Sequence, residues 1–152
     1  MSSPIIIFDL NRTLYDPETD ALLERAVDVL QACLDRGYRL ALVSHNEKAR
    51  ADIIDAFDLR RFFSVISLVD EKNTAVFTDI LTEMTAPIAQ SFAIGDVIPK
   101  EIAIGNTCGL QTIWLRAGKF KDMLPTNLQE QPTYTVGKLW DVLAYLPPVD
   151  AA

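Results

Sequence analysis

The sequence predicts an α/β protein in which helices cover both faces of a mostly parallel sheet, a three-layer αβα sandwich. Short apolar runs alternate along the chain with longer segments whose apolar residues recur every three or four positions, and this alternation indicates strand–helix units. The connections between most of these segments are short, which favours right-handed crossovers between parallel strands. The 152 residues are 49% hydrophobic and 23% charged, as in an ordinary globular domain. We therefore expect a single domain over residues 1–152.

Six short segments are expected to be strands. The first, Ile5–Phe8, is apolar at every position and β-branched at its start, which is typical of a strand buried on both faces of a parallel sheet. Four similar runs follow, and a short segment near the end of the chain is expected to form an edge strand. These later strands are expected at residues 38–43, 65–68, 91–94, 112–115 and 134–136.

The longer segments between the strands are expected to be helices. In the segment from about residue 21 to 36, Val27, Leu30 and Leu34 follow one another at steps of three and four, and Gly37 is a natural helix end. Ser44 could cap a second helix that extends to about residue 57. The remaining helices are expected at about residues 73–84, 99–108 and 138–145.

A long loop is expected at residues 116–132, where glycine and prolines are mixed with polar residues. Loops of this length in compact domains are usually functional or mobile. Arg116, Lys119 and Lys121 make the loop basic within a chain of net charge −7. Two interpretations stay open. The segment is either a solvated charged loop or a loop that gathers phosphate or binds a partner.

The acidic balance and the hydropathy pattern exclude several classes of protein. With a net charge of −7 and a pI near 4.6, most of the surface should repel a phosphate backbone, so nucleic-acid binding is disfavoured. The sequence contains neither a signal-peptide pattern nor an apolar run of about 20 residues that could span a membrane. Cys33 and Cys108 match no metal-binding spacing and are expected to be buried free thiols. We therefore expect a cytoplasmic protein with no membrane contact.

Polar residues follow three of the predicted strands at their carboxyl ends. Asp9 and Asn11 follow the first strand, Ser44 and His45 follow the second, and Asp96 follows the fourth. Ligands of parallel α/β sheets bind beyond the carboxyl ends of the strands, so these side chains should converge. Two carboxylates beside a hydroxyl would suit Mg²⁺ together with a phosphate group.

In their order and strand context these residues resemble the four motifs of the haloacid dehalogenase (HAD) superfamily of phosphohydrolases. The first motif is Asp-x-Asp-x-Thr after a hydrophobic strand, and the second is a Ser or Thr that closes a strand. The third is a Lys near a helix start, and the fourth is Gly-Asp followed by another acid. The matching residues are Asp9, Asn11 and Thr13; Ser44; Lys72; and Gly95, Asp96 and Glu101.

The resemblance implies a Rossmann-like HAD fold and a Mg²⁺-dependent phosphatase. Asp9 would be the nucleophile that forms an aspartyl-phosphate. Mg²⁺ would be held by the carboxylates of Asp9 and Asp96 and by the backbone carbonyl of Asn11. Ser44 and Lys72 would hold the oxygens of the transferring phosphoryl group.

Four further residues are placed by the resemblance or by their neighbours. Thr13 and Glu101 would lie behind the metal ligands, where Glu101 could reach the metal-bound waters or the motif lysine. Lys100 is a rival for the role of motif lysine because it stands beside the fourth motif. His45 could contact the phosphate or act as a base, since its ordinary pKa is close to neutral, but nothing in the sequence shows the direction of its side chain, and an incidental helix-start residue is the favoured interpretation.

Asn11 departs from the family pattern at the position that shuttles a proton. An amide has no titrating proton near neutral pH, so it cannot be a general acid or base. The main prediction is therefore a slow phosphatase, and the alternative is a catalytically impaired module that binds phosphate or a protein. The sequence also leaves open whether Asn11 is native or was introduced to trap a reaction state.

The spacing between the motifs leaves no room for a cap domain. Ser44 follows Asp9 by 35 positions and Lys72 follows Ser44 by 28, and each gap is filled by the predicted strands and helices. The chain thus resembles the capless branch of the superfamily, whose members tend to act on exposed phosphates of macromolecules or to use a neighbouring subunit as a lid. We expect a phosphorylated substrate, with a macromolecular substrate and an oligomer as open expectations.

Overall fold

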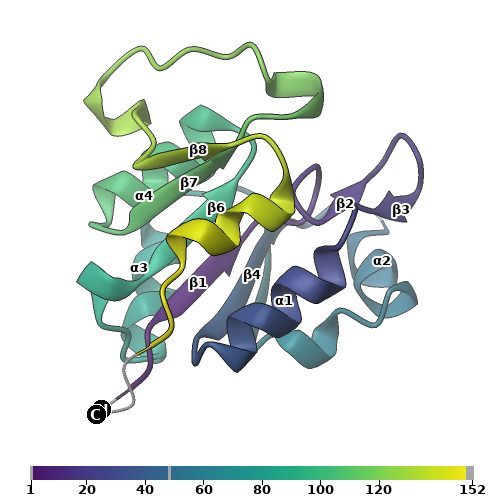
Figure 1. Cartoon of the computed structure of the whole chain (residues 1–152), viewed down its shortest axis with the longest axis horizontal. Coiled ribbons are helices and arrows are strands. Elements are labelled where there is room, and N and C mark those ends of the chain that lie inside the picture. The colour runs from purple at the N-terminus through teal and green to yellow at the C-terminus, as the bar shows by residue number, and fades with distance from the viewer. Residues whose placement is uncertain (1, 48, 150–152) are drawn as a thin grey trace.

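The computed structural model describes residues 2–47 and 49–149 and contains a parallel sheet of six strands in the order β5-β4-β1-β6-β7-β8 (Figure 1). Every neighbouring pair in this sheet is parallel. The α/β Rossmann-like architecture expected from the alternating pattern is therefore confirmed. The strands are β1 (Ile5–Phe8), β4 (Arg39–His45), β5 (Val65–Val69), β6 (Phe92–Gly95), β7 (Gln111–Leu115) and β8 (Tyr134–Val136).

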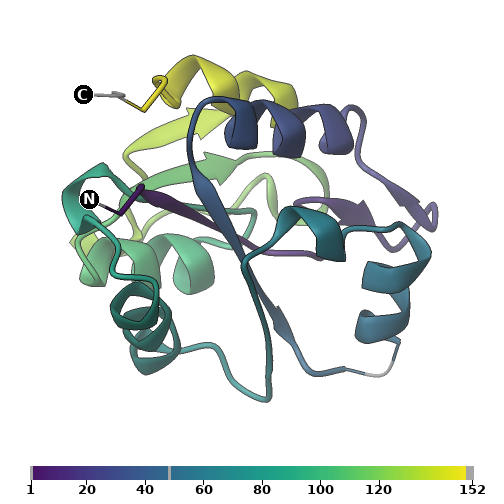
Figure 2. The same ribbon diagram turned by 90° about the horizontal axis from the view of Figure 1, so that it is seen from below.

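Helices pack on both faces of the sheet. The α-helices are α1 (Ala26–Asp35), α2 (Arg50–Ala56), α3 (Thr74–Glu83) and α4 (Ala103–Thr107), and a π-helical segment, Ile98–Ile102, precedes α4. Figure 2 shows α1 and the last helical segment on one side of the sheet, with α3 and α4 on the other. The 3₁₀ segments are Arg60–Phe62, Ile88–Gln90, Gly118–Phe120, Leu128–Glu130 and Leu139–Tyr145.

The strands direct alternate side chains into two separate hydrophobic clusters. Ile6 and Phe8 of β1 belong to the cluster beneath α1 and the C-terminal 3₁₀ helix. Ile5 and Ile7 belong to the cluster beneath α3 and α4. All four side chains have no exposed surface, which is why this strand is apolar at every position.

The helix expected from about residue 21 starts only at Ala26. The preceding residues form a two-stranded antiparallel hairpin of β2 (Tyr15–Asp16) and β3 (Ala21–Leu22). Arg25 has a φ of 63°, in the left-handed region that ends regular helix. Leu23 fits the helical spacing but packs onto the core from the end of the hairpin.

The helix expected directly after Ser44 is also displaced. β4 extends through Ser44 and His45, which pair in register with Leu68 and Val69 of β5, and α2 begins only at Arg50. The prediction of Ser44 as a helix cap is therefore wrong. The sheet continues because its ladder bonds satisfy backbone groups that a helix start would leave unpaired.

Three smaller expectations also differ from the structure. The segment at 99–108 starts with a π-helical turn, and the segment at 138–145 is 3₁₀ rather than α-helical. Cys33 is buried as expected, but Cys108 is only half-buried. Both cysteines are free thiols. Burial raises the pKa of Cys33 to about 12, so this thiol is an inert part of the core.

The chain between the strands is short, as the motif spacing predicted. Between β1 and α1 the chain holds only the β2–β3 hairpin, and residues 70–73 join β5 directly to α3. The carboxyl edge of the sheet is therefore left uncovered at both positions where a cap could be inserted. In the described part of the chain, no helix is long and apolar enough to cross a membrane.

Candidate active site

A cavity of about 260 Å³ lies at the carboxyl edge of the central strands. β1 stands between β4 and β6 in the sheet, so the residues that follow these three strands meet at the point where the strand order reverses. The sequence-predicted residues Asp9, Asn11, His45, Lys72, Asp96 and Glu101 line this cavity, together with Arg12, Glu47, Arg50, Val97, Lys100, Lys119 and Phe120.

Lys72 joins two of the carboxylates at the bottom of the cavity. Its Nζ donates to Asp9 Oδ1 at 2.6 Å and also to Glu101 Oε1. The Lys72 side chain is only 3% exposed. Burial alone would lower the pKa of Lys72, but the charges of Asp9 and Glu101 outweigh it and raise the pKa above its ordinary value. Lys72 is therefore a permanent cation at neutral pH.

Lys100, the rival for this position, also lines the cavity but belongs to the π-helical segment. Among the described residues, it is Lys72 that forms the ion pairs with Asp9 and Glu101. Asp9 Oδ1 also accepts a hydrogen bond of 2.8 Å from the backbone N–H of Leu10. These two donors fix the orientation of the Asp9 carboxylate before any ligand arrives.

Asp9, Asp96 and Glu101 form a buried acidic cluster whose ligand atoms lie within 4.8 Å of one another. Three carboxylates face one ammonium group, so the cluster carries two negative charges in excess when all are ionised. Within the described chain, both carboxylate oxygens of Asp96 and Oε2 of Glu101 are buried without a hydrogen-bond partner. Unpaired buried oxygens of this kind are costly unless a cation or solvent satisfies them.

The same crowding changes the acidity of two members of the cluster. Burial, followed by the charges of Asp9 and Glu101, raises the pKa of Asp96 to about 8. Burial and the charge of Asp9 raise the pKa of Glu101 to about 7, against the opposing effect of Lys72. A divalent cation would favour the ionised forms of both carboxylates, and a hard ion with oxygen ligands fits this donor set.

The residue before Asp96 has to be a glycine because the Glu101 side chain packs directly against it. A Cβ atom at residue 95 would lie 2.6 Å from Glu101 Cγ and 2.8 Å from Glu101 Oε2. Any larger residue would therefore push Glu101 out of the cluster. Asp96 itself is anchored by its backbone carbonyl, which accepts a hydrogen bond of 2.9 Å from Trp114 Nε1.

Arg50 is a site residue that sequence reasoning missed. Its Nη1 donates to Ser44 Oγ at 3.4 Å, and its Nη2 pairs with Glu47 Oε2 at 2.8 Å. The Arg50 side chain is 10% exposed, whereas that of Glu47 is 63% exposed. The pKa of Glu47 is lowered by the hydrogen bond and the charge of Arg50. Arg50 thus places a charged guanidinium fork near Ser44. The fork is paired with the Glu47 carboxylate, which is exposed to solvent.

The other sequence-predicted residues occupy different positions around the cavity. His45 and Asn11 line it, and His45 does so as the last residue of β4 rather than as a helix start. The Asn11 backbone is held by an isolated β-bridge to Tyr15. Thr13 is fully buried and does not line the cavity. Within the described residues its Oγ1 has no hydrogen-bond partner.

The basic loop reaches the cavity through part of its length. Lys119 and Phe120, in the 3₁₀ turn Gly118–Phe120, line the cavity wall. Arg116 instead lies over the ring of Trp114 and donates to the Lys121 carbonyl at 2.8 Å. Of the three basic residues, only Lys119 therefore adds positive charge beside the acidic cluster.

Comparison with known proteins finds similarity to HAD-like proteins. Residues 72–142 match the family model described as HAD-hydrolase-like. Glyceraldehyde 3-phosphate phosphatase from Methanopyrus kandleri is 25% identical over 75 residues, which are 49% of this chain and 32% of that protein. The match therefore spans about a third of the length of this relative.

Solved structures resemble the chain over nearly its whole length. D,D-heptose 1,7-bisphosphate phosphatase from B. bronchiseptica, solved with magnesium and phosphate, superposes with a TM-score of 0.77 at 13% identity. The match covers 94% of this chain and 97% of that one. A haloacid dehalogenase-like hydrolase from Xanthomonas campestris has a TM-score of 0.74 at 12% identity, with 95% of each chain covered. These likenesses establish the shared fold.

Proposed function

We propose that this chain is a haloacid dehalogenase-like, Mg²⁺-dependent phosphohydrolase that uses Asp9 as its nucleophile. The observation that carries the proposal is the buried cluster of Asp9, Asp96 and Glu101, in which Lys72 pairs with Asp9 and Glu101, so that two negative charges are in excess when all three carboxylates are ionised. This cluster lies in a cavity whose other walls include Arg50 and several further cations. A divalent cation would neutralise the acidic cluster, and an anionic substrate would neutralise the cations of the cavity wall.

The metal would be held by the carboxylates of Asp9 and Asp96 and by the backbone carbonyl of Asn11. When bound, it would neutralise charge between the nucleophile and the phosphate. Glu101 would act through Lys72, because its carboxylate holds the ammonium group against Asp9. Lys72 would in turn hold an oxygen of the transferring group as a compact positive charge.

An oxygen of Asp9 would attack the phosphorus atom while the bond to the leaving oxygen breaks, which gives an aspartyl-phosphate and an alkoxide. Ser44 and Arg50 would hold the non-bridging oxygens, since the guanidinium fork matches phosphate geometry. The alkoxide must take its proton from solvent, because Asn11 has none to give. Water then cleaves the intermediate to inorganic phosphate and regenerates Asp9.

The proposal is tested by beryllofluoride, a mimic of the acyl-phosphate, and by phosphate release. Beryllofluoride with Mg²⁺ is expected to raise the melting temperature of the wild type and to leave that of Asp9→Asn unchanged. The wild type should also release phosphate from acetyl phosphate with Mg²⁺ and stop when the metal is chelated. A beryllofluoride shift that survives in Asp9→Asn would place the reaction elsewhere.

We expect the metal-free protein to lose stability as the pH rises from about 4 to about 8. Asp96 and Glu101 titrate at about 8 and 7 when folded, against ordinary values of 3.8 and 4.5. The folded state therefore binds more protons than the unfolded state in this window, so rising pH favours unfolding. The measurement is the melting temperature in a chelator at pH 5 and pH 8.

Asp96→Asn provides the variant for this prediction, and Asp79→Asn on the exposed surface of α3 is its matched control. Asp96→Asn should reduce the fall with pH and should abolish the rise in melting temperature that Mg²⁺ produces. Asp79→Asn should behave as the wild type. An equal Mg²⁺ response in all three proteins would exclude Asp96 as a ligand.

Arg50→Met is expected to weaken inhibition by inorganic phosphate by about tenfold or more, because a charged hydrogen-bonding fork is lost. Arg50→Lys should recover only part of the affinity, since an ammonium group keeps the charge without the fork. Arg60→Met is the control, because Arg60 pairs with Asp55 on the exposed surface. The inhibition constant of phosphate is the measurement, and equal values for Arg50→Met and Arg60→Met would contradict the assignment.

A second candidate function is a regulatory module that binds phosphate or a protein and turns over poorly. Asn11 is the observation that favours it, since the position beside the nucleophile lacks a proton donor. Such a module would still bind phosphate through Ser44, Arg50 and Lys72. The Asn11→Asp comparison described in the Discussion separates the two functions.

A further inference from the structure

We propose that the leaving group of the substrate lies in a groove running from the catalytic cavity to Trp140, and that it is an uncharged alcohol carrying a flat heteroaromatic ring, as in a nucleoside. The inference rests on the proposed phosphohydrolase function. It assigns a substrate class to an active site that no cap domain covers within the described residues. Without a cap, selectivity for the leaving group has to come from the surface beside the cavity.

The groove consists of three consecutive hollows that share residues. Arg12 lines both the catalytic cavity and a small hollow of about 170 Å³. Leu23 and Ala117 line both that hollow and a larger pocket of about 410 Å³. The three hollows are therefore adjacent, and a phosphate ester with its phosphorus beside Asp9 could extend past Arg12 toward the larger pocket.

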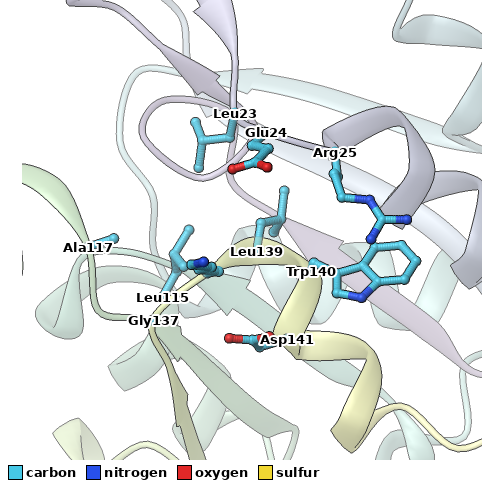
Figure 3. Close-up of a pocket in the computed structure, with 10 residues that line it drawn as sticks. Leu23, Glu24, Arg25, Leu115, Ala117, Gly137, Leu139, Trp140 and Asp141 are labelled. Atoms are coloured by element: carbon cyan, nitrogen blue, oxygen red, sulfur yellow. The ribbon is translucent and has the colours of Figure 1, made fainter.

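The larger pocket has the size and lining of a small-molecule site. Its volume of about 410 Å³ falls within the range of roughly 300–1,000 Å³ that is usual for ligand pockets. Figure 3 shows Leu23, Leu139 and Leu115 among the side chains that line the pocket, with Leu115 at the end of β7. An apolar lining of this kind would favour the body of a ring rather than a chain of hydroxyl groups.

Trp140 supplies a flat surface at the end of this pocket. The Arg25 guanidinium lies over the indole ring, with Cζ 3.4 Å from the ring centroid (Figure 3). Trp140 is nevertheless 37% exposed, so ring surface stays available for a ligand. Indole and guanidinium planes both stack on flat heteroaromatic rings.

The charges around the larger pocket cancel. Glu24 and Asp141 contribute two negative charges, and Arg25 and Lys138 contribute two positive charges. A second phosphate would find no net attraction here, in contrast to the catalytic cavity. The carboxylates can instead accept hydrogen bonds from amino or hydroxyl groups of a neutral ligand. The pocket therefore favours an uncharged, hydrogen-bonding ring over a bisphosphate.

Gly137 allows the pocket to be filled without disturbing the fold. It lines the pocket, and a Cβ atom built on it meets nothing within 4 Å. Its φ lies outside the left-handed region, so a larger residue causes no backbone strain. Gly137→Leu should occupy the pocket, and Gly137→Ala is the matched control because it adds a single methyl group at the same position.

The experiment compares adenosine 5′-monophosphate with acetyl phosphate, which has no ring. In Gly137→Leu the ratio of kcat/KM for adenosine 5′-monophosphate to kcat/KM for acetyl phosphate is expected to fall at least about tenfold, from the lost ring contacts. In Gly137→Ala the ratio should stay within about twofold of the wild type. A ratio that is unchanged in Gly137→Leu would overturn the inference.

Tryptophan fluorescence gives a second measurement that does not depend on turnover. The chain has two tryptophans, and Trp114 is buried, so quenching by adenosine 5′-monophosphate would report on Trp140. Quenching is expected in the wild type and should be lost in Gly137→Leu. If acetyl phosphate is hydrolysed but adenosine 5′-monophosphate neither reacts nor quenches, the groove is wrong and the proposed function stands. If neither adenosine 5′-monophosphate nor acetyl phosphate is hydrolysed, the proposed function fails, and quenching alone decides whether the pocket binds a ring.

Discussion

Asn11→Asp is expected to raise steady-state turnover roughly 10²-fold, which corresponds to about 2.7 kcal/mol in the activation barrier. Asn11 lines the cavity beside Asp9, at the position where the superfamily pattern has its proton-shuttling acid. An aspartate there could protonate the leaving oxygen and later take a proton from the attacking water. General acid–base catalysis typically contributes about 10²–10⁴-fold, so restoring it should have a large effect.

The two chemical steps should differ in how much they depend on residue 11. Formation of the aspartyl-phosphate from p-nitrophenyl phosphate needs little acid catalysis, because nitrophenolate is a good leaving group. Hydrolysis of the intermediate needs a base, and Asn11 supplies none. The wild type should therefore show a burst of nitrophenolate followed by slow turnover, and the burst should disappear in Asn11→Asp.

His45 is the residue that could make the prediction for Asn11→Asp wrong. It also lines the cavity, and an imidazole could act as the base in place of residue 11. Fast turnover by the wild type, without a burst and without a gain in Asn11→Asp, would falsify the assigned role of Asn11. A loss of this turnover in His45→Gln would then identify His45 as the base. Phosphate binding without turnover in either form would favour the regulatory module.

Lys72→Met is expected to destabilise the metal-free protein by about 3–5 kcal/mol, the cost of leaving buried charges without their partner. The Lys72 ammonium is paired with Asp9 and Glu101, and all three side chains are less than a tenth exposed. Removing it leaves three crowded carboxylates with no cation, and methionine restores the volume but not the charge. Urea unfolding in a chelator at pH 8 measures the change in the free energy of unfolding.

Lys100→Met is the matched control for this prediction. Lys100 lines the same cavity but is only half-buried, so its loss should change the free energy of unfolding by less than about 1 kcal/mol. Mg²⁺ should recover part of the stability of Lys72→Met, because the cation replaces some of the missing positive charge. Equal destabilisation by the two substitutions would show that Lys72 is not the counterion of the cluster.

The local sequence pattern was sufficient to predict the parallel sheet and the convergence of the polar residues at one of its edges. The run Ile5–Phe8 is apolar at every position because both faces of β1 are covered, and such a run can be read directly from the chain. Because parallel strands place their carboxyl ends at one edge, Asp9, Asp96 and the end of β4 had to meet there. The prediction needed the order of the strands along the chain rather than any side-chain position.

The sequence did not show where regular structure stops. Leu22 and Leu23 fit a helical period, yet they lie in the β2–β3 hairpin and just after it. Serine is a residue type that often caps helices, yet Ser44 is the penultimate residue of β4 in its pairing with β5. In both cases pairing with another strand, the neighbouring β2 in one and the more distant β5 in the other, outweighed the local preference, and propensity alone has no information about that partner.

The site residues also fall into two groups, those that the sequence indicated and those that only the tertiary structure revealed. The sequence by itself indicated that carboxylates and an amide meet at one edge, since Asp9, Asn11 and Asp96 each follow a strand. Only the tertiary structure distinguished Lys72 from Lys100, because the choice depends on which ammonium reaches Asp9 and Glu101. Arg50 and the groove to Trp140 likewise arise where a turn, a hairpin and two strand ends come together. Such contacts leave no periodicity in the chain, even where the partners are as near as Arg50 and Ser44, so only their packing reveals them.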